Sequence, residues 1–495
     1  MAIQGEIYSY SMKALLTPHI LLRLSVGISM GFIFACDSAV GVTYFVGTTG
    51  NDAHLGTART NAWRTIQSAV DRVSPGDSIV VLAGAYTGAV IRTSGLDSAP
   101  ITLKADDGAA VVLNVKSIAH SSILVVEDWD GIGPVSYWII QGFEIAGSLR
   151  HGIDIRGRAD QSNRCITVLS NRVHHSVATG IFTAFTDDLL ICGNESYSNG
   201  EHGVYCSNSG DRPVVQGNRL HHNTGSGLHM NGDASMGGDG VISGGLIENN
   251  RIYKNGTGGA GINMDGVVGS RVMNNLIYSS PNNSGIALFR QDGAVPSSGN
   301  MILNNTVVMN SNTTARCGWA VTLTAGANSN SILNNILYSY DSICGSVAAP
   351  MASITGMVCN FNSVMNRFSV NGGDTTSDMT TWKSYGYDSN SIIAIPAQLF
   401  INSAADNYQL KTNSPAIDKG ALLTNVFSDI DGILRPQGSA MDIGAYEAMA
   451  PTKSANSGFR LQITYRQPDE PKTPHPDSAA TQSCVPELGR RTGYP

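Results

Sequence analysis

The side chains best suited to chemistry recur at fixed positions of one short repeated phrase. The phrase starts with Gly and an aliphatic residue, as in GIDIR from Gly152, GVYCS from Gly203 and GLHMN from Gly227. Alternate side chains of a strand face opposite sides, so the aliphatic residue points into a core and the next residue points outward. The outward residues of six phrases form a first ladder: Asp154, Phe182, Tyr205, His229, Asn263 and Ala287. Two residues further along each phrase lies a second ladder: Arg156, Ala184, Ser207, Asn231, Asp265 and Phe289.

Both ladders become strongly polar between Tyr205 and Asp265. An ordinary solvated face carries scattered Thr, Ser and Lys, as Thr322 and Thr324 do later in the chain. The change of residue type indicates that this part of the face binds or transforms a polar ligand.

His229 is the candidate base of this face, because an imidazole can accept a proton near neutral pH. His202, just before its own phrase, is a second candidate base, and the phenol of Tyr205 can donate a proton. The alternative for His229 is a purely structural rung stacked on its neighbours. The paired histidines His174-His175 and His221-His222 follow other strands, and we expect them to be polar surface.

Two arginines can hold a carboxylate through bidentate hydrogen bonds, Arg156 and Arg290. Asp154, Asn231 and Asn263 add polar side chains that could bind the same ligand. No Lys stands in either ladder.

A loop from about Gly232 to Gly240 leaves the repeat beside His229 and carries Asp233 and Asp239. Together with Asp265, these carboxylates offer the hard oxygen ligands that Ca²⁺ prefers, although no calcium-loop motif is present. Asp and Gly are also the usual residues of solvated turns, so both interpretations of the loop stay open.

Repeated asparagines predict the elements that position these residues. An apolar pair followed by Asn returns in VLSNRVHHS, ICGNESYSNG, VVQGNRLHHN, LIENNRIYKNG, VMNNLIYSS, ILNNTVVMN and ILNNILYSY. Their asparagines are Asn171, Asn194, Asn218, Asn250, Asn275, Asn305 and Asn335. A period of about 20 to 50 residues is typical of solenoids, and the short alternating runs indicate strands. We therefore predict an all-β, right-handed parallel β-helix in which these asparagines stack as a structural column.

The ends of the repeat carry different patterns. Trp63 to Val73 reads as a short amphipathic helix that caps the N-terminal coil, as terminal repeats require. A compact phrase from about residue 411 to 447 is expected to be a C-terminal cap. The domain boundaries are a signal segment at 1–41, the β-helix at 42–448 and a disordered tail at 449–495 rich in Pro, Ser, Thr and charge.

Composition excludes several classes of protein. Of 495 residues only 14% are charged and 7% are aromatic, while 55 are Gly, which argues against coiled coils and helical solenoids. The net charge of −7 gives no general attraction for phosphate, so we expect no nucleic-acid partner. We expect a monomer.

The N-terminal region predicts export. Lys13 and Arg23 precede the apolar stretch 24–36, and small residues follow, as in a secretory signal peptide. The stretch is short for a membrane span, which needs about 20 residues. We expect a secreted, periplasmic or cell-surface protein without a stable membrane span, and lipidation at Cys36 is an open alternative. Cys317 and Cys344 could pair by oxidation, but sequence alone does not fix any pairing.

The sequence resembles a known group of proteins at both ends of the repeat. YFVGTTGNDAHLGT and WRTIQSAVDRVSPGDSIVVLAGAY resemble the entry to bacterial pectate-lyase-like β-helix proteins, which include chondroitinase B and related alginate lyases. SPAID, DIDG, RP and DIGAYE resemble the end of many secreted β-helix proteins. Together the two stretches span roughly residues 43–447. The resemblance implies a carbohydrate-active protein, but such folds carry several activities.

Three functions fit the ladders and the resemblance. The first is a lyase that cleaves a uronic-acid polysaccharide by β-elimination, which requires a neutraliser of the carboxylate, a base and an acid. Proteins of this group often use Ca²⁺ as the neutraliser and a basic residue as the base, and the absence of a ladder Lys departs from their lysine-dependent pattern. The second is a glycoside hydrolase with two carboxylates from Asp233, Asp239 and Asp265. The third is a non-catalytic glycan-binding surface protein, and a uronate C5-epimerase is a close relative of the first.

Overall fold

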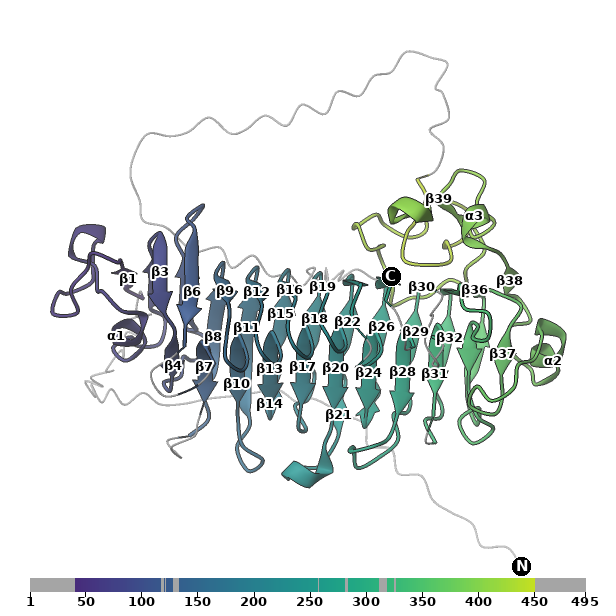
Figure 1. Cartoon of the computed structure of the whole chain (residues 1–495), viewed down its shortest axis with the longest axis horizontal. Helices are drawn as coiled ribbons and strands as arrows, with labels where there is room; N and C mark the ends of the chain where they lie inside the picture. The colour runs from purple at the N-terminus through teal and green to yellow at the C-terminus, as the bar shows by residue number, and fades with distance from the viewer. Residues whose placement is uncertain are drawn as a thin grey trace, which may run out of the picture. The chain divides into compact units, whose positions relative to one another are not determined.

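The computed structural model describes residues 41–449 except 117–119, 121, 128–132, 257, 281–283, 311–317 and 325. The predicted signal segment and disordered tail lie outside the described residues, apart from residues 41 and 449, and so does Cys317. Within the described part, parallel strands stack into three long sheets that wind as successive coils (Figure 1). The predicted parallel β-helix is confirmed.

Each long sheet takes one strand from nearly every coil. Sheet A contains β1 (Thr43–Val46), β2 (Ser78–Val81), β5 (Ile101–Ala105), β8 (Ser136–Gln141), β11 (Asn163–Leu169), β15 (Leu190–Cys192), β18 (Val214–Gln216), β22 (Leu246–Glu248), β26 (Arg271–Met273), β29 (Met301–Leu303), β32 (Ser331–Leu333) and β35 (Val358–Asn360), with β14 (Thr186–Asp187) paired to β11. Sheet B contains β3 (Gly84–Thr87), β6 (Val111–Val115), β9 (Glu144–Ala146), β12 (Arg172–His174), β16 (Glu195–Tyr197), β19 (Arg219–His221), β23 (Arg251–Tyr253), β27 (Leu276–Tyr278), β30 (Thr306–Met309), β33 (Ile336–Ser339), β36 (Ser363–Val364) and β38 (Ile392–Ile393). Sheet C contains β4 (Ala89–Ile91), β7 (Leu124–Glu127), β10 (Ile153–Arg156), β13 (Ile181–Ala184), β17 (Val204–Ser207), β20 (Leu228–Asn231), β24 (Ile262–Asp265), β28 (Ile286–Phe289), β31 (Val321–Leu323), β34 (Val347–Ala348) and β37 (Phe368–Ser369).

Shorter elements complete the described chain. Two small sheets pair β21 (Ile242–Ser243) with β25 (Val267–Val268) and β39 (Phe400–Asn402) with β40 (Asn407–Leu410). The α-helices are α1 (Ile66–Val70), α2 (Met379–Ser384) and α3 (Pro396–Leu399), and the 3-10 helices are η1 (Arg59–Asn61), η2 (Ala234–Met236) and η3 (Ser403–Ala405). None of the helices in these described ranges is long and apolar enough to cross a membrane.

The asparagine column is buried and bonded as predicted. Asn194 Nδ2 donates to Asn218 Oδ1 at 3.1 Å, and the same link repeats from Asn218 to Asn250 at 3.0 Å. Each Asn also donates to a backbone carbonyl of the preceding coil, as Asn218 does to Ile191. The column continues to Asn362, one coil beyond the last predicted member.

The N-terminal end of the stack is covered by α1, a shorter helix than the predicted span from Trp63 to Val73. Thr65 caps the helix through a hydrogen bond from the Ser68 amide, and Ile66, Ala69 and Val70 are buried against the first coils. The capping role of this segment is therefore confirmed.

The opposite end of the stack is covered by α2, which sequence analysis missed. Trp382 lies fully buried and stacks on Phe368 with ring centroids 4.9 Å apart. The segment from about residue 411, predicted to be the C-terminal cap, instead packs sideways on outward residues of sheets A and B. Its Ile443 and Ala445 join a cluster with Val308 and Ile336. This location differs from the prediction because the outward face of these coils is apolar and needs a cover.

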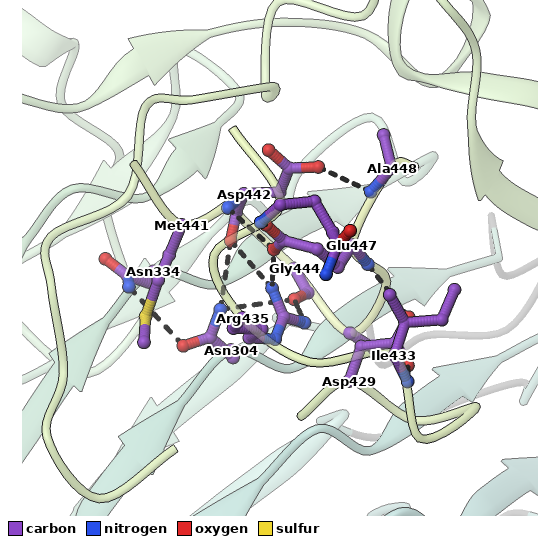
Figure 2. A network of polar contacts seen from close by, with 12 residues as sticks. Asn304, Asn334, Asp429, Ile433, Arg435, Met441, Asp442, Gly444, Glu447 and Ala448 are labelled. Atoms are coloured by element: carbon purple, nitrogen blue, oxygen red, sulfur yellow. Dashed lines mark hydrogen bonds and ion pairs between the residues drawn. The ribbon is translucent and has the colours of Figure 1, made fainter. Parts of the chain in front are cut away.

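Two pairs of consecutive asparagines, Asn304-Asn305 and Asn334-Asn335, help to hold that segment in place (Figure 2). The second Asn of each pair builds the internal column, whereas the first turns outward in the left-handed region, with φ of 50° at Asn304 and 59° at Asn334. Asn304 donates to the Asp442 carbonyl at 3.0 Å. Behind them Arg435 and Glu447 form a fully buried ion pair at 2.8 Å. The segment 411–447 is thus held in place by a buried network of hydrogen bonds and an ion pair.

Candidate functional site

The register of sheet C places the two predicted ladders as expected. Tyr205 pairs with His229 and His229 with Asn263, while Ser207, Asn231 and Asp265 align in the second column. The inward residues between them are fully buried, as Leu228 and Met230 are. His202, Tyr205, His229, Asn231 and Asn263 form the cluster that we call the polar face.

Three rings of the polar face touch one another. The centroid of His229 lies 4.6 Å from that of Tyr205 and 4.7 Å from that of His202, and Tyr205 and His202 are 5.3 Å apart. All three side chains are partly buried. The structure therefore brings together both candidate bases and the candidate acid.

Burial keeps the two histidines neutral. Removal from water lowers the pKa of His229 to about 4. Burial and then the neighbouring His229 lower the pKa of His202 to about 3. Burial also raises the pKa of the Tyr205 phenol, so this side chain keeps its proton at neutral pH.

Hydrogen bonds fix which ring nitrogen carries the proton. The Asn263 Oδ1 accepts from the Ala260 amide, so its Nδ2 is the group that donates to His229 Nδ1 at 3.3 Å. His202 Nδ1 likewise accepts from the Ser226 amide at 2.9 Å. A neutral imidazole has one donor and one acceptor nitrogen, so both rings carry their proton on Nε2. This tautomer favours donation to a ligand, whereas the sequence predicted a base.

Asn231 links the polar face to the backbone of Asp233 and to the carboxylate of Asp292. Its Oδ1 accepts from the Asp233 amide at 3.0 Å, so the two protons of its Nδ2 point to Tyr205 Oη at 3.2 Å and Asp292 Oδ2 at 3.4 Å. Both Asp233 and Asp292 lie near enough to Tyr205 to raise its pKa further. Since the phenol oxygen accepts from Asn231, its own proton remains for donation.

Sequence analysis missed Asp292 because its DG context is that of an ordinary turn. The backbone amide of Ala234 bonds to the Asp292 carbonyl, so the turn lies beside the predicted loop. The turn can pack this closely because Gly266 and Gly293 lie against each other without side chains. A Cβ on Gly293 would lie 2.5 Å from the Gly266 Cα. His151 was also missed, although it precedes Gly152 as His202 precedes Gly203. Its ring stacks on Phe182 at 4.5 Å.

The three carboxylates predicted to bind Ca²⁺ do not fit a shared site. Asp265 is buried and accepts from the amides of Gln291, Asp292 and Gly293, which anchors their turn. Asp233 caps η2, and Asp239 accepts from the Val241 amide. Across the described ranges no cluster of three or more His, Cys, Asp or Glu could hold a metal ion. The reaction steps proposed for this site therefore involve no bound cation.

The two predicted arginines lie far apart on sheet C. Arg156 ends β10, whereas the exposed Arg290 follows β28 and donates to the Gly293 carbonyl at 3.3 Å. Five strand spacings separate β10 from β28, or about 24 Å, so the two cannot hold the same carboxylate. Asp154 is bound to Arg156 at 2.6 Å and is nearly inaccessible.

Comparisons with known proteins agree with the coil architecture. Residues 44–210 match the family model described as the Pel9A-like right-handed β-helix region. A crystal structure of pectate lyase Pel9A is similar with a TM-score of 0.55 and 18% identity, over 83% of this chain and 97% of that one. XylC in complex with xylose is similar with a TM-score of 0.50 and 11% identity, over 82% and 98%. No curated protein matches the sequence significantly. At these identities the similar structures show the fold, and the predicted right-handed β-helix with its pectate-lyase-like resemblance is confirmed.

Proposed function

We propose that this chain, a right-handed β-helix of the pectate-lyase-like type, cleaves a uronic-acid polysaccharide by β-elimination at its polar face. The observation that carries the proposal is the Asn231 amide, which joins the Tyr205 hydroxyl and the Asp292 carboxylate beside two neutral histidines. These groups supply an acid, a base and neutral donors within one small surface.

Neutralisation of the uronate carboxylate is assigned to His202 and His229. Both present an Nε2–H, and their rings lie 4.7 Å apart at the centroids. Hydrogen bonds to a carboxylate lower the cost of removing the proton next to it, because they stabilise the negative charge that develops there. Asn263 acts as a positioning residue for this step, because its hydrogen bond to His229 Nδ1 places the His229 proton on Nε2.

Proton transfer is assigned to Asp292 and Tyr205. The Asp292 carboxylate takes the proton from C5, the C5–H electron pair forms the double bond between C4 and C5, and the bond from C4 to the bridging oxygen breaks. The Tyr205 hydroxyl gives its proton to that oxygen, and solvent then carries the proton from Asp292 back to Tyr205, which restores both groups. A base role for His229, the prediction from sequence, would require its Nε2 to be free of its proton.

A second candidate is a glycoside hydrolase, because Asp233 and Asp292 flank the same Asn231. This pair differs from the predicted combinations of Asp233, Asp239 and Asp265, because Asp265 is fully engaged with backbone amides and Asp239 accepts from the Val241 amide. A C5-epimerase would begin with the same proton removal as the lyase and return a proton to C5 instead of breaking the chain.

The products separate these functions. The protein is incubated with pectate, alginate, glycosaminoglycans and neutral glucans, and ultraviolet absorbance and new reducing ends are measured together. A lyase yields both signals, since its product carries a new double bond conjugated to the carboxylate. New reducing ends without absorbance would favour the hydrolase and overturn the proposal. Neither signal with any polymer would also overturn it and leave a C5-epimerase or a glycan-binding protein. Calcium dependence is checked by repeating the active assay with a chelator, and we expect no loss of rate.

Export is part of the same proposal, because a polysaccharide substrate lies outside the cell. We expect the mature protein to lack the predicted signal segment. Mass spectrometry of the expressed chain in cell fractions checks this expectation, and an intact N-terminus in the cytoplasm would contradict it.

A further inference from the structure

Arg156 on β10 is held in one orientation on the outward face of sheet C. Its Nε donates to Asp154 Oδ1 at 2.6 Å, and its Cζ lies 4.5 Å from the ring centre of Phe182. A guanidinium over an aromatic face is attracted by the ring, so the two contacts fix both the position and the plane of the group. This geometry exists before any ligand arrives.

One end of this guanidinium has no acceptor. Arg156 Nη2 is buried and makes no hydrogen bond to any described residue, although buried polar groups are almost always paired. The neighbouring carboxylates are already engaged. Asp154 binds Arg156 Nε, and Glu127 on the adjacent rung binds Arg92 at 2.9 Å and His120 at 2.8 Å. The Arg156 side chain is 19% exposed, so an acceptor from a bound ligand can still approach it.

The position of Arg156 relates it to the polar face. In sheet C, β10 and β17 are separated by β13 alone. Two strand spacings place the Arg156 rung about 10 Å from the Tyr205 rung, a length that two linked pyranose rings cover. Phe182, on the rung between them, contacts both Arg156 and Tyr205.

We propose that Arg156 binds a carboxylate two sugar residues away from the bond that is cleaved. A charged guanidinium prefers a carboxylate to a neutral hydroxyl, because the bond is then charge-assisted on both sides. The inference rests on the proposed function and narrows its substrate class to polymers with runs of uronic acid. A polymer with isolated uronates would fill the polar face but leave Arg156 without a partner.

Binding measurements test this subsite separately from catalysis. Affinity electrophoresis is run in gels containing polygalacturonate, alginate or chondroitin sulfate, each beside its carboxyl-reduced form. Arg156→Ala should weaken binding to the preferred polyuronate about 10- to 100-fold, the range for a lost charged hydrogen bond. It should leave the weak binding of the reduced polymer unchanged. Arg158→Ala is the matched control, because Arg158 lies two residues beyond Arg156, after the end of β10, and pairs with Asp160 on the surface.

The same experiment can overturn the inference. Unchanged affinity in Arg156→Ala, an equal loss for the reduced polymer, an equal loss in Arg158→Ala, or no binding of any polyuronate by the wild type would each contradict it. If the single variant does not fold by circular dichroism, Asp154→Asn/Arg156→Gln removes both charges together and takes its place. Polyuronate binding that depends on Arg156, without any cleavage product, would uphold the subsite and reject the proposed lyase.

Discussion

At the scale of single residues, the chemistry depends on which nitrogen or oxygen carries a proton. Strand periodicity predicted that Tyr205, His229 and Asn263 share one face, because alternation and register follow directly from the repeated phrase. It could not predict the tautomer of His229, which depends on the Asn263 amide. It also could not predict the role of Asp292, because this residue lies in the turn after β28, two coils beyond Asn231.

The neutral histidines predict a specific pH dependence of turnover. With pKa values of about 4 for His229 and about 3 for His202, neither group titrates near pH 6.5. The plot of kcat/KM against pH should therefore have no acidic limb at pH 6 to 7. An acidic limb at that pH, lost in His229→Gln, would instead restore the base role predicted from sequence.

Substitutions on the polar face should separate it from the other histidines. Tyr205→Phe removes the acid and should lower kcat about 10²- to 10⁴-fold, and His229→Ala removes a donor and should lower kcat/KM about 10²- to 10³-fold. His222→Ala is the control, because this exposed histidine directly follows β19 of sheet B and lies away from the polar face. Wild-type turnover in folded His229→Ala would remove His229 from the mechanism.

At the scale of elements, buried hydrogen bonds hold the coils in register. The asparagine column could be predicted because each Asn follows the same apolar pair, and a stacked amide satisfies its neighbours. The sideways location of the C-terminal segment could not, because the outward cluster around Val308 and Ile336 carries no local signal of what covers it.

Loss of one asparagine from the column should lower the unfolding temperature. Asn250→Leu leaves the backbone amide of Asn218 and one of the two N–H bonds of its Nδ2 group without an acceptor. Unsatisfied buried donors cost about 1–3 kcal/mol each, so the variant should lower the unfolding temperature clearly. Asn390→Ala, at an exposed position, should not. Equal unfolding temperatures for the two variants would show that the column contributes little.

At the scale of the whole described chain, buried histidines couple stability to acid. His151, His202 and His229 have folded pKa values of about 4, 3 and 4, below the unfolded value of about 6.5. The unfolded chain therefore binds protons first, so their contribution is fully present above pH 6.5 and is lost as the pH falls towards 4. Asp442 acts in the opposite direction, because burial raises its pKa to about 6.

Thermal unfolding measured at pH 7.5, 5.5 and 4.5 checks this balance. We expect the unfolding temperature to fall with pH, and to fall less in His151→Phe than in the wild type. The exposed His222→Ala serves as the control. A wild-type unfolding temperature that rose between pH 7.5 and 4.5 would show that carboxyl groups with a raised pKa, such as Asp442, dominate.

The central claim is that a uronate chain lies on the outward face of sheet C and reacts at the polar face. A crystal structure of the folded Tyr205→Phe variant with a uronate oligosaccharide tests it most directly. The account predicts a sugar carboxylate within hydrogen-bond distance of Nε2 of His202 or His229, with the adjoining bond beside residue 205. An oligosaccharide bound on sheet A or sheet B, or one whose carboxylates avoid both histidines, would contradict it.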